Sequence, residues 1–406
     1  MYSDSLHSTL ESKNILLVTS MYPTPDPEYK ASPICHFFAK QWKLLGYNVK
    51  VVHFCNALPV FYSWIGKLFG NYGMKRMWSV SFLKPNRKKA FYEIDGIPII
   101  YVPIIHIIPH IGVSQHRRLK AYKYLRNILI NENFIPDFVL SHWHSMAYFM
   151  PFFKNDFPNV ITSVVIHNKL SYKRQFHSLF NSIDTWGFRS RSLQEAFESI
   201  YGRQQREFIC LSGVPSNYVP ENYPKKDFSH GINHFVFVGS LLKLKNVDIT
   251  IKALNRCFKE ENYIFDIVGD GPELDALQAL TNDLKENRVV FHGRLTREKA
   301  QEIMNNAQVF IMVSSVEAFG LVYVEAMAKG CIPIATLGQG ADGFVVDGDN
   351  GFLCKANDIE GLCSVIDEIR HFDSQHLAAL SSTAYETAKS MTDEKVAENY
   401  LTNVCF

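Results

Sequence analysis

Short runs of apolar residues alternate along the chain with longer segments whose apolar residues recur every three or four positions. A continuous apolar run of about five residues is typical of a strand buried on both faces, and the helical period is typical of a helix packed against it. Strands that alternate with helices favour a parallel sheet. The predicted strands cover residues 14–19, 49–53, 137–141, 160–166, 235–238, 264–268, 289–293, 309–313 and 332–336. The pattern therefore predicts an α/β protein.

The length of 406 residues and the position of the prolines predict more than one domain. At roughly 150 residues per domain, a chain of this length holds two or three. Pro215, Pro220 and Pro224 fall between two blocks of strands and helices, where a linker is expected. We predict a first domain over residues 1–215, a linker over 216–232, a second domain over 233–381 and a helical C-terminal segment over 382–406.

The segment 309–336 contains the clearest candidate for a ligand site. An apolar run is followed by a polar loop, and Leu321 then begins a helix that Gly330 is placed to end. The unpaired backbone N–H groups of Phe319, Gly320 and Leu321 and the positive end of the helix dipole would meet at the carboxyl edge of the sheet. This arrangement predicts an anion site suited to a diphosphate.

Two carboxylates flank this predicted anion site. Glu317 lies in the loop, and Glu325 lies within the helix. A carboxylate accepts hydrogen bonds from hydroxyl groups and repels a phosphate, so the pair suits sugar hydroxyls on either side of a diphosphate. The combination predicts a nucleotide sugar as the ligand. The alternative is that both residues are ordinary glutamates without a ligand.

Glu317 and Glu325, with Phe319-Gly320-Leu321 between them, resemble the glutamate signature of retaining glycosyltransferases with the GT-B fold, family 4 type. The resemblance implies two Rossmann-like parallel-sheet domains that face a cleft, with the C-terminal segment crossing back to the first domain. It implies that Glu317 meets the hydroxyls of the donor sugar and that Glu325 holds the ribose hydroxyls. The implied donor is a nucleoside diphosphate sugar, expected to be a UDP-sugar, with neither a cofactor nor a bound metal.

Polar residues after two strands of the second domain extend the predicted donor site. Lys243 and Lys245 follow the first of these strands, so their ammonium groups are expected near the diphosphate. The family has Gly-Arg-Leu here, followed by a lysine; Lys245 matches that lysine, whereas Ser240 stands at the arginine position. Arg294 follows the strand 289–293, at the corner that lines the base pocket in the family. A solvated pair is the alternative for the two lysines.

The first domain contributes His167, which follows the strand 160–166. A histidine just past a buried strand is commonly a hydrogen-bonded structural residue. Family members, however, place a histidine after this strand, near the donor sugar and the leaving group. We therefore predict catalytic roles for His167, Glu317 and Lys245. Ala31-Ser32-Pro33 stands where the family usually has a glycine-rich loop.

Two patterns could suggest a metal, but each has a simpler interpretation. His142 and His144 point the same way along a strand, yet no cysteine or acidic residue accompanies them, which favours structural packing. Asp347 and Asp349 have the D-x-D spacing but lie in a glycine-containing turn without a second acidic cluster. The eight cysteines contain no C-x-x-C pair, so neither a zinc site nor a disulfide framework is predicted.

Basic and aromatic residues are concentrated in residues 57–126. This segment has twelve Lys and Arg against two Asp and Glu, whereas the whole chain carries a net charge of only +2. One hypothesis is a surface that contacts an anionic membrane leaflet or a lipid-linked acceptor. The alternative is an inserted loop that packs on its own domain. No recognised nucleic-acid-binding module accompanies the patch, so a nucleic acid partner is not predicted.

We predict the location of the protein from two expected absences, a signal peptide and a membrane-spanning segment. Residues 1–13 are polar and include Asp4 and Glu11, so no signal peptide is expected. The apolar segment 97–111 is too short to span a bilayer and is interrupted by prolines. We predict a cytoplasmic protein, with peripheral contact at the inner face of a membrane as a hypothesis.

The resemblance, together with these residues, implies a metal-independent, retaining glycosyltransferase of the hexosyltransferase type. Its acceptor is predicted to be a saccharide or a lipid-linked molecule in the assembly of a surface polysaccharide or glycoconjugate. One alternative is a GT-B sugar-nucleotide epimerase, which would turn over the donor without an acceptor. Another is a non-catalytic partner subunit that binds nucleotide sugars. Ser240 and the missing glycine at Ala31-Ser32-Pro33 favour that subunit, whereas Glu317, Glu325 and Lys245 favour an enzyme.

Overall fold

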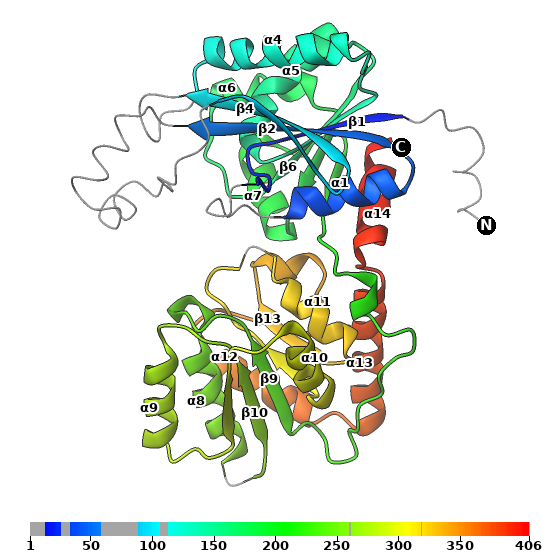
Figure 1. The fold of residues 1–406 in the computed structure, drawn as a ribbon. Coiled ribbons are helices and arrows are strands. Elements are labelled where there is room, and N and C mark those ends of the chain that lie inside the picture. The colour runs from blue at the N-terminus through cyan, green and yellow to red at the C-terminus, as the bar shows by residue number, and fades with distance from the viewer. Residues whose placement is uncertain are drawn as a thin grey trace. The chain divides into compact units, whose positions relative to one another are not determined.

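The protein forms two compact units, each built around its own sheet (Figure 1). Unit 1 contains Met1–Phe188, Ala196–Phe208 and Ala397–Phe406, and unit 2 contains Arg189–Glu195 and Ile209–Val396. The segment 189–195, which the sequence analysis placed in the first domain, therefore belongs to unit 2. The computed structural model describes residues 13–25, 33–57, 88–105, 113–259, 261–317 and 319–405.

The sheet of unit 1 has eight strands in the order β3-β4-β2-β1-β5-β6-β7-β8. The strands are β1 (Asn14–Thr19), β2 (Asn48–Ala57), β3 (Ala90–Ile94), β4 (Ile97–Ile105), β5 (Phe138–His142), β6 (Ile161–Ile166), β7 (Thr185–Phe188) and β8 (Glu207–Ile209). The strands from β4 to β7 pair in parallel, and β3 pairs antiparallel with β4 at the edge. The chain order reverses at β1, which lies between β2 and β5, as in doubly wound folds.

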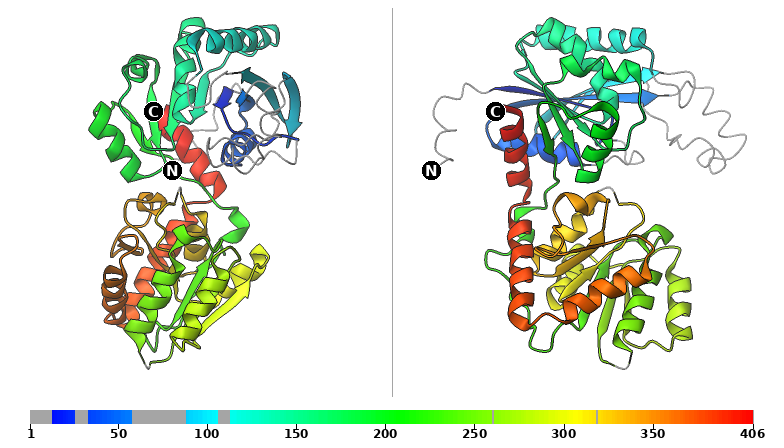
Figure 2. Two further views of the ribbon diagram at one scale, coloured as in Figure 1. Left: turned by 90° about the vertical axis from the view of Figure 1, so that its left-hand side faces the viewer. Right: turned by 180° about the vertical axis from the view of Figure 1, so that it is seen from behind.

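Helices cover both faces of this sheet, with α4 and α5 on one face and α1 on the other (Figure 1). The helices are α1 (Ile34–Leu44), α4 (Gln115–Asn131), α5 (Met150–Asp156), α6 (Arg174–His177) and α7 (Arg191–Tyr201). The C-terminal helix α14 (Asp393–Cys405) packs beside α1, where the indole N–H of Trp42 donates to the carbonyl of Ala397 at 3.1 Å. Both views of Figure 2 show this helix, in red, beside the elements of unit 1.

The sheet of unit 2 has six strands, which pair in parallel in the order β11-β10-β9-β12-β13-β14. The strands are β9 (His234–Val238), β10 (Ile264–Val268), β11 (Val289–Gly293), β12 (Val309–Ile311), β13 (Ile332–Thr336) and β14 (Phe352–Cys354). The helices are α8 (Val247–Phe258), α9 (Leu274–Asp283), α10 (Arg297–Asn306), α11 (Leu321–Ala328), α12 (Ile359–Arg370) and α13 (Ser374–Lys389). Helices α8, α9 and α12 lie on one face, and α10, α11 and α13 lie on the other (Figure 1).

The predicted fold class of two Rossmann-like parallel-sheet units is confirmed, with local differences. The strand predicted over 309–313 ends at Ile311, because the backbone beyond it turns into the loop that leads to α11. The C-terminal segment 382–406 contains the second half of α13, which begins at Ser374, and the helix α14 after a short break. None of the helices in the described ranges has the length and apolar character that crossing a bilayer requires.

Candidate functional site

The topology of unit 2 brings two loops together at one point of its sheet. The chain order reverses between the neighbouring strands β9 and β12, so the loops that follow them lead to helices on opposite faces of the sheet, α8 and α11 (Figure 1). Ligands of open parallel sheets bind at such a reversal point. The loop after β9 carries Lys245, and the loop after β12 carries Glu317 and leads into α11. We call Lys245, Glu317 and the N-terminus of α11 the switch-point site.

Lys245 and Glu317 form an ion pair at the centre of the switch-point site. The Nζ atom of Lys245 lies 2.6 Å from Oε2 of Glu317, and the two side chains are only 16% and 14% exposed. The same ammonium lies 3.8 Å from Sδ of Met312. An ammonium has three N–H donors, so this lysine can hold a phosphate oxygen while it stays paired with the carboxylate.

The two loops of the switch-point site are fastened to each other by Asn246. This residue has a left-handed backbone (φ +52°), a conformation that asparagine tolerates better than most residues. Its buried side-chain amide donates to the carbonyl of Val313 at 2.7 Å and to Oγ of Ser315 at 2.9 Å. The backbone N–H of Ser315 also donates to the carbonyl of Leu244 at 2.8 Å. Lys245 is thus held in position by its neighbour, which the sequence analysis missed.

The N-terminus of α11 is shaped by Gly320, whose φ of +77° is favourable only for glycine. A Cβ atom at this position would lie 2.6 Å from the ring of Tyr323, so a side chain would displace the start of the helix. Phe319 is buried against Phe344, with ring centroids 5.1 Å apart. Its side chain therefore packs inside unit 2, and the backbone N–H groups at Gly320 and Leu321 belong to the open first turn of the helix.

Glu325 lies in the second turn of α11 and pairs with Arg297, the first residue of α10. The carboxylate is buried, and the guanidinium lies over the ring of Tyr218 with its Cζ 4.5 Å from the centroid. Burial lowers the pKa of Arg297, but the hydrogen bond and charge of Glu325 outweigh it and raise that pKa. Glu325 is thus in a contact of its own, separate from the Lys245–Glu317 pair. Arg297 is a second residue that the sequence analysis missed.

The other predicted donor contacts of unit 2 are exposed. Ser240 and Arg294 lie in the loops that follow β9 and β11. Lys243 is also exposed, and its ammonium lies 3.3 Å from the carboxylate of Asp248 at the start of α8. The structure therefore brings Lys245 and Glu317 together, whereas Lys243 has a separate acidic partner.

His167 follows β6 in unit 1, as predicted, and two neighbours hold its ring. Its Nε2 atom lies 3.0 Å from Nδ1 of His142, which is fully buried. The ring of Trp143 stacks on it, with centroids 4.3 Å apart and an interplanar angle of 12°. Trp143 has a positive φ of 71°, an uncommon conformation for a bulky residue. The strand end of β5 thus fixes the orientation of His167.

The other polar patterns noted in the sequence have local roles. The carboxylate of Asp347 accepts a hydrogen bond from the backbone N–H of Leu353 at 2.8 Å, which fastens the turn that contains Gly348. Within the described ranges, no group of three or more His, Cys, Asp or Glu side chains is arranged to hold a metal ion. The eight cysteines are free thiols. Ala31 and Ser32 lie outside the described residues. Within the basic segment 57–126, residues 58–87 and 106–112 also lie outside them.

Comparison with known proteins identifies the class that this fold and site define. Residues 220–387 match the family model described as Glycosyl transferases group 1. An uncharacterized glycosyltransferase of Methanocaldococcus jannaschii is 26% identical over 314 residues, which cover 72% of this chain and 82% of that protein. The poly(glycerol-phosphate) alpha-glucosyltransferase of Bacillus subtilis is 27% identical over 258 residues, which cover 60% of this chain but only 37% of that protein.

A similarity to a solved structure extends over both units. The structure of Anabaena HepE in complex with UDP superposes with a TM-score of 0.63 at 17% identity and covers 97% of this chain and 99% of that chain. The fold is therefore GT-B. The predicted similarity to the group 1 glycosyltransferases is confirmed over residues 220–387, and the comparisons support the predicted glycosyltransferase activity at that level.

Proposed function

We propose that this glycosyltransferase moves a hexosyl group from a UDP-sugar to a saccharide or lipid-linked acceptor, with retention of the anomeric configuration and without a bound metal. The observation that carries the proposal is the largely buried ion pair of Lys245 and Glu317 beside the N-terminus of α11. Two similarities support the proposed donor and the proposed stereochemistry. Anabaena HepE was solved with UDP, and the name of the Bacillus subtilis relative specifies an alpha-glucosyl product.

The chemistry proposed for the switch-point site is stabilisation of the leaving group. When the bond between the anomeric carbon and the diphosphate oxygen breaks, negative charge develops on the diphosphate. The ammonium of Lys245 and the first-turn N–H groups of α11 would neutralise that charge in a partly dehydrated setting. Glu317 would accept hydrogen bonds from the sugar hydroxyls and so fix the sugar relative to the breaking bond. The acceptor hydroxyl oxygen then bonds to the same face of the anomeric carbon, and its proton passes to the departing diphosphate oxygen.

Glu325 and Arg297 are proposed to recognise the ribose of the donor. One carboxylate oxygen of Glu325 is held by the guanidinium of Arg297. A carboxylate has two oxygens with about four acceptor positions, so further positions remain for the two ribose hydroxyls. In unit 1, His167 is proposed to support the reacting face of the sugar, with its orientation set by His142 and Trp143.

The acceptor and the location are proposed from the composition of residues 57–126. The basic and aromatic content of residues 57–126 supports an acceptor at an anionic membrane, in the assembly of a surface polysaccharide or glycoconjugate by a cytoplasmic enzyme. Pelleting with vesicles of anionic phospholipid tests this idea, because electrostatic attachment weakens as salt screens the charges. Absence from the pellet at low salt would contradict it.

The proposed reaction is tested by a thermal-shift and hydrolysis screen across UDP-sugars and other nucleotide sugars. The wild-type protein should be stabilised and should hydrolyse one donor slowly, and NMR of the first product formed should show the anomeric configuration of the donor. Glu317→Gln should lower turnover by about 10²-fold. Glu298→Gln, which changes an exposed glutamate of α10, is the matched control. Full activity in Glu317→Gln, or an inverted product, would contradict the proposal.

A further inference from the structure

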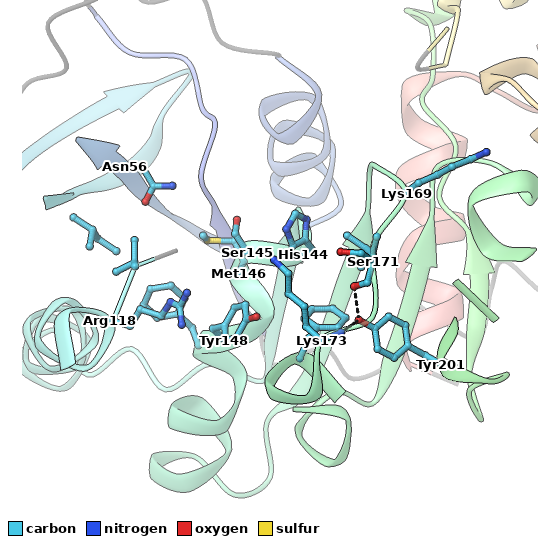
Figure 3. A pocket seen from close by; sticks show the side chains of 15 residues that line it. Asn56, Arg118, His144, Ser145, Met146, Tyr148, Lys169, Ser171, Lys173 and Tyr201 are labelled. Carbon is cyan, nitrogen blue, oxygen red and sulfur yellow. Dashed lines mark hydrogen bonds between the residues drawn. The ribbon is translucent and has the colours of Figure 1, made fainter. Parts of the chain in front are cut away.

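Unit 1 contains a cavity of about 300 Å³ at the carboxyl edge of its own sheet. Asn56 and Ile104 line it from the ends of β2 and β4, and the 3₁₀ turn His144–Phe149 lines it after β5. The loop after β6 and the helix α4 complete the wall (Figure 3). Parallel sheets bind ligands at this edge, and the volume is at the lower end of the range for small-molecule sites.

The charge of this cavity is its most informative property. Its lining includes Arg118 from α4 and Lys169 and Lys173 from the loop after β6. None of the described residues that line it is an aspartate or a glutamate. A site that binds neutral sugar hydroxyls commonly uses carboxylates as acceptors, whereas a site with cations and no carboxylate favours an anion.

Arg118 is held in place by an aromatic neighbour. Its guanidinium carbon lies 3.9 Å from the centroid of the Tyr148 ring, so one flat face is covered and the N–H edges remain for a ligand. Burial lowers the pKa of Arg118, although an arginine stays charged at any physiological pH. A partly dehydrated guanidinium gains more from an anionic partner than one in bulk water.

The loop that carries Lys173 is fastened at two points by one phenol. The hydroxyl of Tyr201 donates to the carbonyl of Ser171 at 3.0 Å and accepts from the backbone N–H of Lys173 at 3.0 Å. Figure 3 shows the side chain of Lys173 extending towards the ring of His144, whereas Lys169 extends away from the other labelled side chains. The two hydrogen bonds therefore hold the backbone at Ser171 and Lys173 in place.

His144 adds a polar group whose hydrogen-bonding capacity is incomplete. Its Nδ1 atom is buried and has no hydrogen-bond partner among the described residues. Burial lowers the pKa of His144, and the charge of Lys173 lowers it further. Two cations and an imidazole thus converge from three segments of the chain, which is the arrangement that a multiply charged anion would satisfy.

We propose that this cavity binds a phosphate or diphosphate group of the acceptor, held by Arg118 and Lys173, so that the enzyme glycosylates a phosphorylated molecule. The inference rests on the proposed function, because it specifies the acceptor for a donor bound in unit 2. The phosphate could belong to a soluble phosphorylated saccharide or to a lipid headgroup, since both present the same anion.

The first experiment measures anion binding with the donor site already occupied. UDP is titrated into the full-length protein by calorimetry, and inorganic pyrophosphate is then titrated at saturating UDP. Wild-type protein should bind pyrophosphate, and Arg118→Gln/Lys173→Gln should bind it at least about tenfold more weakly. The matched double variant Lys120→Gln/Arg174→Gln removes the same charge from exposed neighbours that do not line the cavity and should stay within about twofold.

The outcomes separate the two proposals. UDP binding without pyrophosphate binding, or equal losses in both double variants, would overturn the cavity assignment and leave the proposed function intact. Absence of UDP binding would count against the proposed function itself. UDP affinity and thermal midpoint should be unchanged in both double variants, which shows that any loss is not a folding defect.

A second arm distinguishes the source of the phosphate. The protein is pelleted with vesicles of phosphatidylcholine containing phosphatidic acid, with and without soluble pyrophosphate. Loss of pelleting in Arg118→Gln/Lys173→Gln but not in the matched variant, together with competition by pyrophosphate, would assign a lipid phosphate. Pyrophosphate binding in the calorimeter with no cavity-dependent pelleting would assign a soluble one.

Discussion

The switch-point site of unit 2 and the cavity of unit 1 that Arg118 and Lys173 line both lie at the carboxyl edge of a parallel sheet, but they differ in charge. In unit 2 the central lysine is paired with a carboxylate at 2.6 Å, whereas the described lining of the cavity has cations and no carboxylate. A paired cation suits a ligand with both a phosphate and sugar hydroxyls, and an excess of cations suits an anion. The fold thus sets the location of each site, and the side chains set its ligand.

The difference also predicts how each site responds to its surroundings. The Lys245–Glu317 pair has no net charge, so its attraction for a diphosphate depends on short contacts and on the α11 N-terminus. The described lining of the cavity carries net positive charge, and Lys169 and Lys173 are exposed, so its attraction for anions should weaken more as salt rises.

Replacement of Lys245 by methionine should have the largest effect. The change removes the cation from the leaving diphosphate, so turnover should fall by about 10²- to 10³-fold. It also leaves Glu317 unpaired and nearly buried, which should lower the free energy of unfolding by up to about 3 kcal/mol. The double variant Lys245→Met/Glu317→Gln should recover most of the thermal midpoint but none of the activity. Recovery of both would show that the pair is structural.

Introduction of a carboxylate into the cavity should make it resemble the switch-point site. Ser171→Glu places an acid between Lys169 and Lys173, and pyrophosphate affinity should fall by about tenfold as the cations become paired. Ser178→Glu adds the same charge on an exposed residue that does not line the cavity and is the control. Equal losses in the two variants, measured by calorimetry at saturating UDP, would mean that only the net charge of unit 1 matters.

Replacement of Arg297 by glutamine should weaken donor binding without abolishing turnover. The guanidinium orients Glu325, so its loss should raise the dissociation constant for UDP by about fivefold. Turnover at saturating donor should change by less than about twofold, because the residue does not contact the reacting atoms in the proposed arrangement. Lys299→Gln, on the exposed face of the same helix, is the control. An unchanged UDP affinity would remove Glu325 from the proposed ribose site.

The smallest expected effect is a change in the titration of His144. Burial and Lys173 lower the pKa of His144 below the ordinary histidine value of about 6.5, so the folded state favours the neutral ring. The neutral ring of His144 therefore contributes fully to the stability of the folded state above about pH 6.5. This contribution is lost as the pH falls through the lower pKa that His144 has in the folded state. Lys173→Gln should raise the pKa of His144, and bound pyrophosphate should raise it in the wild type. The measurement is an NMR titration of the imidazole C–H signals, and an unchanged pKa in both experiments would contradict the cavity arrangement.

The sequence predicted those features that depend on local pattern. Alternating apolar runs and helical periods predicted the two parallel sheets, and Gly320 beside Glu317 predicted the start of α11 because a helix N-terminus has a local signature. Arg297 was missed because its partner Glu325 is distant in sequence and only the packing of α10 against α11 brings them together. The cavity was missed for the same reason, since Arg118 and Lys173 belong to separate segments.

Local sequence patterns were sufficient to predict the fold class, the loop that leads into α11 and the two charged residues at its edge. The tertiary structure decided which charges meet: Lys245 pairs with Glu317, Arg297 pairs with Glu325, and Arg118 and Lys173 line one cavity without a carboxylate in its described wall. The physical reason is that hydrophobic periodicity is read along the chain, whereas electrostatic interactions depend on distances across it, and strand order sets those distances.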